Sequence, residues 1–566
     1  MDQKCTKKKN YPFTPNPTFY LTIKQGKRFL KKKKDIGSLN VAIQIFKEAL
    51  TFEPTSSLFH LLGRALFYKG KITEHPHHWQ EAIKQYEKAE MRATSDRELR
   101  AIRWDKGRLL LHLGKKEREP DLLKEAIACY QEFPPSSRTH SAVWSDYGDA
   151  LCTLGSWLSS SVWIQSGIQK YESAGNTSSY HISSRIARGS YLLYTITHRS
   201  EDYQIANQRY QRAIQQHPHK KKLWKEAISM TLERGQWHNS RESLCQAIHD
   251  ACQMPDKQKG HAILSLKIQA LAKLGEIDQN LSLIKEAERE LSNLRVSSSP
   301  LHALTEGWVM MALANYFSDH NQYYGASQSF QQALSSSLCQ SNIWLMMGLS
   351  HHKAGLLDHQ PESQKMAIRF LQKGINIKAS PHLFIAYAQA VLAGGESTSC
   401  YLNEALLALK QGEAMTQSTR NQRRYRFLKG LVLFRLGEEA DEEGQVLESI
   451  DYLKEILPWS SDFPEIHYRY ALSIMHMAIN CQDAAAISTA CLHFAQSVKQ
   501  GIHTGEALME WGIALMHQME IEKKDRLEQT AERLLKMAIR EGESRAQYYL
   551  GCLYCTTGKI GKALTA

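Results

Sequence analysis

Long apolar runs are missing from this sequence of 566 residues, in which no stretch of eighteen or more apolar residues occurs. A helix that crosses a bilayer needs about 20 such residues, so we expect no membrane span. The N-terminus is basic but has no apolar segment, which argues against a conventional secretory signal. We therefore expect a cytoplasmic protein, with export through a route that needs no hydrophobic signal as the alternative.

Paired cysteines are also scarce. The 11 Cys are scattered singly through apolar stretches, a pattern typical of reduced, buried thiols rather than of a disulfide framework. Cys552 and Cys555 form a CxxC pair on an expected helix, with no second pair and no paired His nearby. Because a structural zinc site needs about four ligands, we interpret these two as core cysteines.

Catalytic and cofactor-binding motifs are absent. The sequence has no Walker-type loop, no GxGxxG after a strand, no GxSxG and no HExxH. We place the histidines of "EHPHHW" (His75, His77, His78) in an inter-helix loop, and we expect the adjacent pair His351 and His352 to point in different directions. Metal sites need converging ligands, so both groups are interpreted as incidental. We expect a protein that is not an enzyme and has no cofactor and no metal.

Positive charge is concentrated at one end. Of the formal charge of +13, residues 1–35 carry +9, from eleven Lys or Arg against two Asp, and the other 531 residues carry +4. This basic head suggests a nuclear import signal, an anionic-lipid patch or a phosphate contact. A solvated basic face is favoured, because the body is near neutral and no RNA-reading motif occurs. The candidate basic patch is Lys27, Arg28, Lys31, Lys32, Lys33 and Lys34.

A repeat with a period of about 41 residues runs through the chain. Small or apolar residues recur with steps of 39 to 44 residues, and such a fixed period is typical of a solenoid. We call these residues the A markers: Gly63, Gly107, Gly148, Gly189, Ile228, Ile268, Gly307, Gly348, Ala388, Gly430, Ala471, Gly512 and Gly551.

A second series follows the first. Small residues such as Ala82, Ala126 and Gly167 are followed four positions later by a large one, such as Tyr86 or Tyr130. Three positions further on the residue is usually small again. Offsets of four and seven lie on one helical face, where alternating small and large side chains let neighbouring helices interlock.

These residues resemble the tetratricopeptide repeat. Residues 206–218 match its second helix, with Ala206, Tyr210, Ala213 and Pro218 in place. The resemblance implies an all-α fold, a right-handed superhelical α-solenoid of stacked antiparallel helix pairs, with about fourteen repeats. We expect residues 1–18 to be a flexible basic segment and residues 19–566 to be a single solenoid.

The repeats are longer than the family pattern. The family spaces its two small residues by twelve, whereas nineteen separates them after most A markers here. A glycine seven positions after the marker, as at Gly70, Gly114, Gly155, Gly355, Gly395 and Gly437, is expected where the first helix ends. Proline at Pro76, Pro120 and Pro361 is expected in the first turn of the second helix. We expect the second helix to gain about one turn and the loop between the helices to take the rest. These loops are either a contact edge or insertions with no binding role.

The resemblance implies that the first helices line a concave groove, with residues three before, one after and four after each A marker facing it. The Met-rich C-terminal half suits hydrophobic segments of varied sequence, although packing against neighbouring helices is the competing interpretation of these side chains. The Lys, Asn and Arg of the family's carboxylate clamp are missing at the matching positions, which disfavours a chaperone-tail adaptor. The candidate groove residues are Phe67, Trp104, Arg108, Leu304, Trp308, Met311, Phe427, Leu431, Phe434, Tyr468, Met475, Met509 and Met516.

We therefore expect a non-catalytic scaffold or adaptor whose partners are proteins presenting extended or hydrophobic segments. A nucleic-acid-associated repeat protein that uses the basic head is one alternative, and an exported effector that recruits host proteins is another. The last repeat stops three residues after Ala563. Terminal repeats normally need a polar cap, so either this end packs poorly or it docks onto a partner or a second copy through Tyr548, Tyr549 and the CxxC pair.

Overall fold

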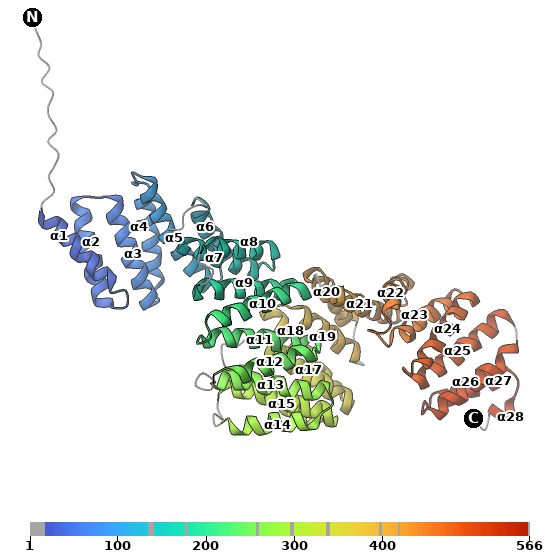
Figure 1. Cartoon of the computed structure of the whole chain (residues 1–566). Helices are drawn as coiled ribbons and strands as arrows, with labels where there is room; N and C mark the ends of the chain where they lie inside the picture. Colours follow the sequence, from blue (N-terminus) through green and yellow to red (C-terminus); the bar gives the residue numbers. More distant parts are fainter. Residues whose placement is uncertain are drawn as a thin grey trace, which may run out of the picture. The chain divides into compact units, whose positions relative to one another are not determined.

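The computed structural model describes residues 17–133, 141–175, 179–197, 199–255, 260–294, 299–335, 340–394, 399–416, 419–523 and 525–563. These residues form α-helices joined by short connections, without a β-strand among them (Figure 1). The predicted all-α fold is confirmed. None of the helices in this part of the chain combines the length and apolar character that crossing a bilayer requires.

Contacts divide the chain into two compact units. The first comprises Met1–Ile196 with Ser200–Leu223, and the second comprises Thr197–Arg199 with Trp224–Ala566. The predicted flexible segment lies almost wholly outside the described residues, and α1 begins at Pro17. The single solenoid over residues 19–566 stays a prediction. The helices of the first unit are α1(Pro17–Lys31), α2(Ile36–Phe52), α3(Ser56–Thr73), α4(Pro76–Glu90), α5(Asp96–Glu117), α6(Pro120–Gln131), α7(Ser141–Trp157), α8(Ser161–Ser173), α9(Tyr180–Thr197) and α10(Ser200–Gln216).

The second unit begins within α11. Its helices are α11(Lys221–His238), α12(Arg241–Gln253), α13(His261–Ile277), α14(Leu281–Asn293), α15(Pro300–Phe317), α16(His320–Ala333), α17(Gln340–Asp358), α18(Pro361–Ile377), α19(Pro381–Ala393), α20(Ser399–Met415), α21(Thr419–Ala440), α22(Glu443–Ile456), α23(Ile466–Asn480), α24(Ala484–Lys499), α25(Thr504–Glu522), α26(Glu528–Arg540), α27(Ala546–Thr556) and α28(Ile560–Ala563). Short 3-10 turns lie at Leu457–Trp459 and Asp525–Leu527.

The helices are arranged in pairs. We call the odd-numbered helices A helices and the even-numbered ones B helices. From α1 to α8, and again from α12 to α28, each helix packs against the next along the chain, and A helices such as α3 and α5, or α23 and α25, also contact each other. The described residues contain fourteen such pairs, from α1 with α2 to α27 with α28, which confirms the predicted number of repeats.

Seven of the A markers are glycine because the large residue of the following B helix lies directly against them. A Cβ atom added at Gly63 would lie 2.8 Å from the Tyr86 ring, and one at Gly307 would lie 2.5 Å from the Phe330 ring. Both rings are fully buried. The same arrangement at Gly26, 2.8 Å from the Phe46 ring, supplies a marker for the first pair, which the sequence analysis did not include. The repeat pattern is therefore a pattern of helix-to-helix contact.

The glycines seven positions after the marker at Gly70, Gly114, Gly155, Gly355 and Gly437 do not end the A helices, so that prediction was wrong there, and Gly395 lies outside the described residues. Helix α3 continues to Thr73, past Gly70, and α21 continues to Ala440, past Gly437. A Cβ atom at Gly70 would lie 2.4 Å from Nε1 of Trp79, in the first turn of α4. These glycines make room for the B helix one turn further along, and they lie inside the helix for that reason.

The expected long loops are also absent from the described pairs. Two residues connect the helices at 74–75, 118–119, 318–319, 359–360 and 441–442, and Pro76, Pro120 and Pro361 each begin a B helix as predicted. The first loop residue adopts a left-handed conformation without being glycine, as at Glu74 (φ 55°) and Arg118 (φ 56°). The additional residues of each repeat lengthen both helices, so they do not form a row of projecting loops.

The prediction of buried thiols is wrong for most of the described cysteines. Cys152 and Cys491 are buried, whereas Cys245, Cys252, Cys400, Cys481 and Cys555 are exposed. Their sequence neighbours are apolar because the helices are amphipathic, and the cysteines lie on the solvent side of those helices. None of the cysteines in the described ranges forms a disulfide.

Candidate binding surface on the A helices

In the first unit the A helices are connected by a series of ion pairs. Asp105 of α5 is 7% exposed, and its carboxylate lies 2.9 Å from Nε2 of His60 and 3.3 Å from Nε of Arg64, both on α3. Arg108, one turn further along α5, also reaches Asp105, at 3.3 Å. Three basic groups therefore surround one buried carboxylate.

The same arrangement is repeated one A helix later. The indole Nε1 of Trp104 donates to Asp146 of α7 at 3.1 Å, and Nε of Arg108 lies 3.5 Å from the same carboxylate. The Arg108 guanidinium also lies over the Trp104 ring, 5.5 Å from its centroid. Two predicted groove residues, Trp104 and Arg108, are thus brought together, and each has an acidic partner that sequence reasoning missed.

A third acidic residue continues the series. Asp149 of α7 lies 3.1 Å from NH2 of Arg185 on α9 and 3.8 Å from Nζ of Lys115 on α5. The Tyr171 hydroxyl donates to Asp149 at 2.6 Å. Opposite charges alternate along α3, α5, α7 and α9, so this face of the first unit is polar but largely satisfied by its own partners.

The buried carboxylates differ in pKa. Burial alone would raise the pKa of Asp105, but the hydrogen bond from His60 and the charges of Arg64 and Arg108 together lower it below its usual value. Burial raises the pKa of Asp146, and Asp149 adds to this effect, while Trp104 and Arg108 oppose it. Two partners on α3 thus hold Asp105 ionised more firmly than Asp146.

The second unit contains acidic groups without such partners. Neither Glu438 of α21 nor Glu510 of α25 makes an ion pair within the described part of the chain. Burial raises the pKa of Glu510 to about 7; the charge of Arg545 opposes this, and the nearby carboxylates of Glu506, Glu543 and Glu438 add to it. Burial likewise raises the pKa of Glu438. Sequence reasoning missed both residues.

The predicted groove residues fall into two classes. Five are buried in the packing between helices and present no surface: Phe67, Met311, Tyr468, Met475 and Met509. Eight are half-buried: Trp104, Arg108, Leu304, Trp308, Phe427, Leu431, Phe434 and Met516. Phe427 contacts the Phe463 ring at 5.1 Å, and Phe434 contacts the His476 ring at 6.0 Å. The half-buried residues alone offer area to a partner, and the groove itself stays a prediction.

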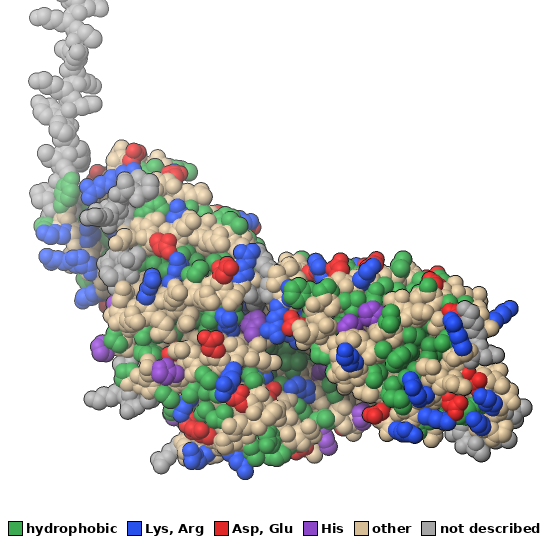
Figure 2. All heavy atoms as spheres, turned by 45° about the vertical axis from the view of Figure 1, so that its right-hand side comes forward, with side chains coloured by type: hydrophobic (Ala, Val, Ile, Leu, Met, Phe, Trp, Pro, Cys, Tyr) green, Lys and Arg blue, Asp and Glu red, His purple; other side chains and the backbone are tan. Residues whose placement is uncertain are grey.

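The candidate basic patch is exposed on α1 and the turn that follows it. Lys27, Arg28 and Lys31 to Lys34 all face solvent, and blue side chains gather over this end of the chain in Figure 2. Nζ of Lys33 lies 4.8 Å from the centroid of the Tyr68 ring on α3. The patch is therefore available to an anionic partner and is anchored in part by an aromatic side chain.

The histidine groups differ from each other. His351 contacts the Tyr324 and Phe370 rings, whereas Nδ1 of His352 lies 2.9 Å from Gln364, so this pair diverges as predicted. His77 and His78, however, lie in the first turn of α4 rather than in a loop. That prediction was wrong because Pro76 begins the helix.

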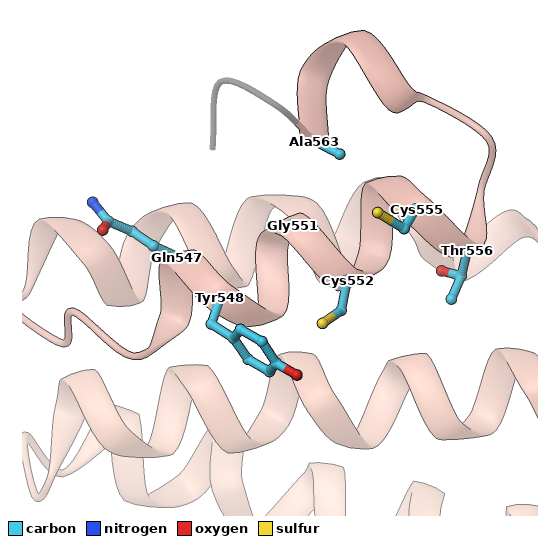
Figure 3. A pocket seen from close by; sticks show the side chains of 7 residues that line it. All are labelled: Gln547, Tyr548, Gly551, Cys552, Cys555, Thr556 and Ala563. Atoms are coloured by element: carbon cyan, nitrogen blue, oxygen red, sulfur yellow. The ribbon is translucent and has the colours of Figure 1, made fainter.

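An apolar pocket of about 560 Å³ lies at the last helix pair. Figure 3 shows side chains along α27 with Ala563 of α28 beside them. Tyr548 is 70% exposed, Cys555 is exposed and Cys552 is half-buried, so the interpretation of these cysteines as core residues is wrong. Self-association through this end stays a prediction. The pocket is lined by Gln547, Tyr548, Gly551, Cys552, Cys555, Thr556 and Ala563.

No known family model matches the chain, and no curated protein sequence is similar to it. A chain from the crystal structure of the APC/C hetero-tetramer Cut9-Hcn1 is 14% identical to this protein, with a TM-score of 0.44. The match spans 97% of the present chain and 94% of that chain. A tetratricopeptide repeat protein from Parabacteroides merdae ATCC 43184 is 16% identical, covers 59% of this chain and 99% of its own, and gives a TM-score of 0.33. The description of the fold rests on the helix pairs themselves.

Proposed function

We propose that this protein is a non-catalytic cytoplasmic scaffold that binds extended or hydrophobic segments of partner proteins along the A helices of its second unit. The supporting observation is a set of half-buried apolar residues there: Leu304, Trp308, Phe427, Leu431, Phe434 and Met516. Five of them pack on one side against the core, and Phe434 contacts the His476 ring at 6.0 Å. Rigid aromatic and apolar side chains held in this way are typical of the residues that dominate binding energy at protein interfaces.

Charge favours the second unit as a surface for protein rather than for nucleic acid. Residues 224–566 contain 34 Lys and Arg against 37 Asp and Glu. A phosphate backbone would be repelled by such a surface, because nucleic-acid affinity comes mainly from neutralised phosphates.

The test is a selection of peptides from a displayed library on the purified chain, followed by titration of the selected peptide. Replacing Trp308 and Phe434 by alanine removes two half-buried aromatic groups, and we expect the dissociation constant to rise by about tenfold or more. The matched control replaces Leu447 and Leu492, exposed apolar residues on B helices, by alanine. Equal weakening by both double variants would show that the A helices are not the binding surface.

A nucleic-acid function using the basic patch predicts the opposite set of results. Complexes isolated from native cells would then be lost on nuclease treatment or at high salt, because phosphate contacts release counterions. Neutralising Lys31 to Lys34 with glutamine would abolish them, whereas the Trp308 and Phe434 variant would keep them. Partners that survive nuclease and salt, and are lost with Trp308 and Phe434, support the scaffold.

A further inference from the structure

The first two turns of α4 present three side chains that are able to bind a metal. His77 and His78 follow Pro76, and Glu81 lies one turn further along. One ligand atom of each residue lies within 4.8 Å of the ligand atoms of the other two. Residues three and four apart face the same side of a helix, so Glu81 can meet both histidines. The cluster lies wholly within the first unit, whereas the proposed binding surface belongs to the second.

This turn is held firmly by its neighbours. Pro76 is the first residue of α4, and Trp79 is 1% exposed. The indole of Trp79 fits against Gly70, where an added Cβ atom would lie 2.4 Å from Nε1, and it contacts the His112 ring at 5.7 Å. Because the backbone that carries the two histidines is fixed in this way, little conformational entropy is lost when they bind a ligand.

The surroundings of His78 and Glu81 bear on whether they can take a ligand. Nδ1 of His78 is buried and has no hydrogen-bond partner. Glu81 contacts Nζ of Lys47 at 3.6 Å, and Lys47 is exposed and free to turn toward solvent.

We propose that His77, His78 and Glu81 form a binding site for Zn²⁺. Two imidazoles and a carboxylate are a ligand set that zinc accepts in tetrahedral geometry, whereas Mg²⁺ and Ca²⁺ prefer oxygen ligands alone. The fourth position goes to water or to His75, whose ring centroid lies 5.8 Å from that of His78. Lys69 and the positive end of α4 oppose a cation, so the site binds less tightly than a closed structural site with four protein ligands.

The test is isothermal titration of the untagged, chelator-treated full chain with Zn²⁺ alone. We expect one site, weakened by about tenfold or more in H78A and in E81Q, and weakened less in H75A. Co²⁺ serves as a spectroscopic probe, because its visible absorption reports tetrahedral nitrogen and oxygen ligation. Circular dichroism confirms that each variant is folded.

The chain offers a matched control in its second His-Pro-His sequence, His217, Pro218 and His219. Lys220 stands where the third histidine would be and Leu223 stands where the carboxylate would be, so H219A should leave zinc binding unchanged. Absence of binding by the unmodified chain would overturn the proposal. So would equal affinity in the unmodified chain, H78A and E81Q, because binding would then occur elsewhere. None of these outcomes depends on the function of the A helices in the second unit.

Discussion

The two units are built from the same helix pair but carry different charges. Residues 1–223 contain 37 Lys and Arg against 21 Asp and Glu, whereas residues 224–566 contain 34 against 37. In the first unit acidic and basic side chains pair across successive A helices. In the second unit the A helices carry more apolar side chains, and two acidic groups, Glu438 and Glu510, make no ion pair among the described residues, although Arg545 reaches Glu506 of α25 at 3.9 Å.

The difference can be located at two positions of the repeat. Arg64, one residue after its A marker, pairs with Asp105, which lies two residues before the next marker. Arg108 and Asp146 occupy the same two positions one repeat later. In the second unit Glu510 also lies two residues before a marker, but Leu472 stands where the arginine would be. Contacts between helices fix the markers, and the flanking positions are left free to set the surface chemistry.

The largest expected effect is the loss of the Asp105 charge. D105N keeps the size of the side chain but leaves Arg64 and Arg108 partly buried with less compensation, so we expect a loss of about 3 kcal/mol. Native-state hydrogen exchange of amides in α3 and α5 measures this locally. Because the pKa of Asp105 is lowered in the folded chain, its contribution is present above the usual aspartate pKa and is lost as the pH falls through the folded value.

The control for this prediction is D121N. Asp121 pairs with Lys124 at 2.8 Å, but both side chains are largely exposed. Exposed pairs of this kind contribute little, so hydrogen exchange in α6 should be unchanged. If D105N changed stability as little as D121N, the ion pairs between the A helices of the first unit would contribute no more to its stability than an exposed surface pair.

A smaller loss of stability is expected from substitutions at the A markers, which both units share. G63A in the first unit and G307A in the second each place a methyl group less than 3 Å from a buried ring, which should cost about 2 kcal/mol in either unit. Gly551 has open space around its Cβ position, so G551A should stabilise α27 by up to about 1 kcal/mol through helix propensity. Urea denaturation compares the three. A cost confined to one unit would show that the pairs are packed differently.

The sequence allowed the fold to be predicted because most of the glycine A markers record a contact with the following B helix. Gly63 and Tyr86 are 23 residues apart, and the spacing recurs since the same helix-to-helix distance recurs. The connection between the helices was predicted wrongly for a related reason. Gly70 was interpreted as a helix end, yet it makes room for Trp79 inside the helix. From the sequence alone, a glycine that allows close packing inside a helix cannot be distinguished from one that ends the helix.

The candidate surface was predicted less well. Spacing alone placed Phe67 and Met509 on the same face as Trp308 and Phe434, but the first two are buried. A shift of one or two residues in helix register decides whether a side chain is buried or half-buried. The register depends on how neighbouring helices pack, which the spacing of residues in the sequence does not describe. The acidic partners were visible, since Asp105 and Asp146 hold one position in successive repeats. The signal that could have identified these partners is their position two residues before an A marker.

The smallest predicted effect concerns Glu510. Its folded pKa of about 7 lies above that of the unfolded chain, so the folded chain binds more protons between the two values. The free energy of unfolding therefore falls as the pH rises through this window. A shift of this size corresponds to about 3 kcal/mol, but the amide of E510Q is itself a polar group that would be largely buried, so we expect it to stabilise α25 by only about 1 kcal/mol at pH 8 and to change little at pH 4. Thermal denaturation at the two pH values measures the difference.

L472R tests whether the missing arginine is the cause. In the first unit an arginine at this position reaches the acidic group of the next A helix, as Arg64 reaches Asp105 at 3.3 Å. A guanidinium supplied from α23 should therefore lower the pKa of Glu510, by about one unit, and flatten the pH dependence of stability. NMR titration of the Glu510 carboxyl carbon measures the pKa directly. An unchanged pKa would mean that burial and the neighbouring carboxylates, and not the absence of this partner, set the pKa of Glu510.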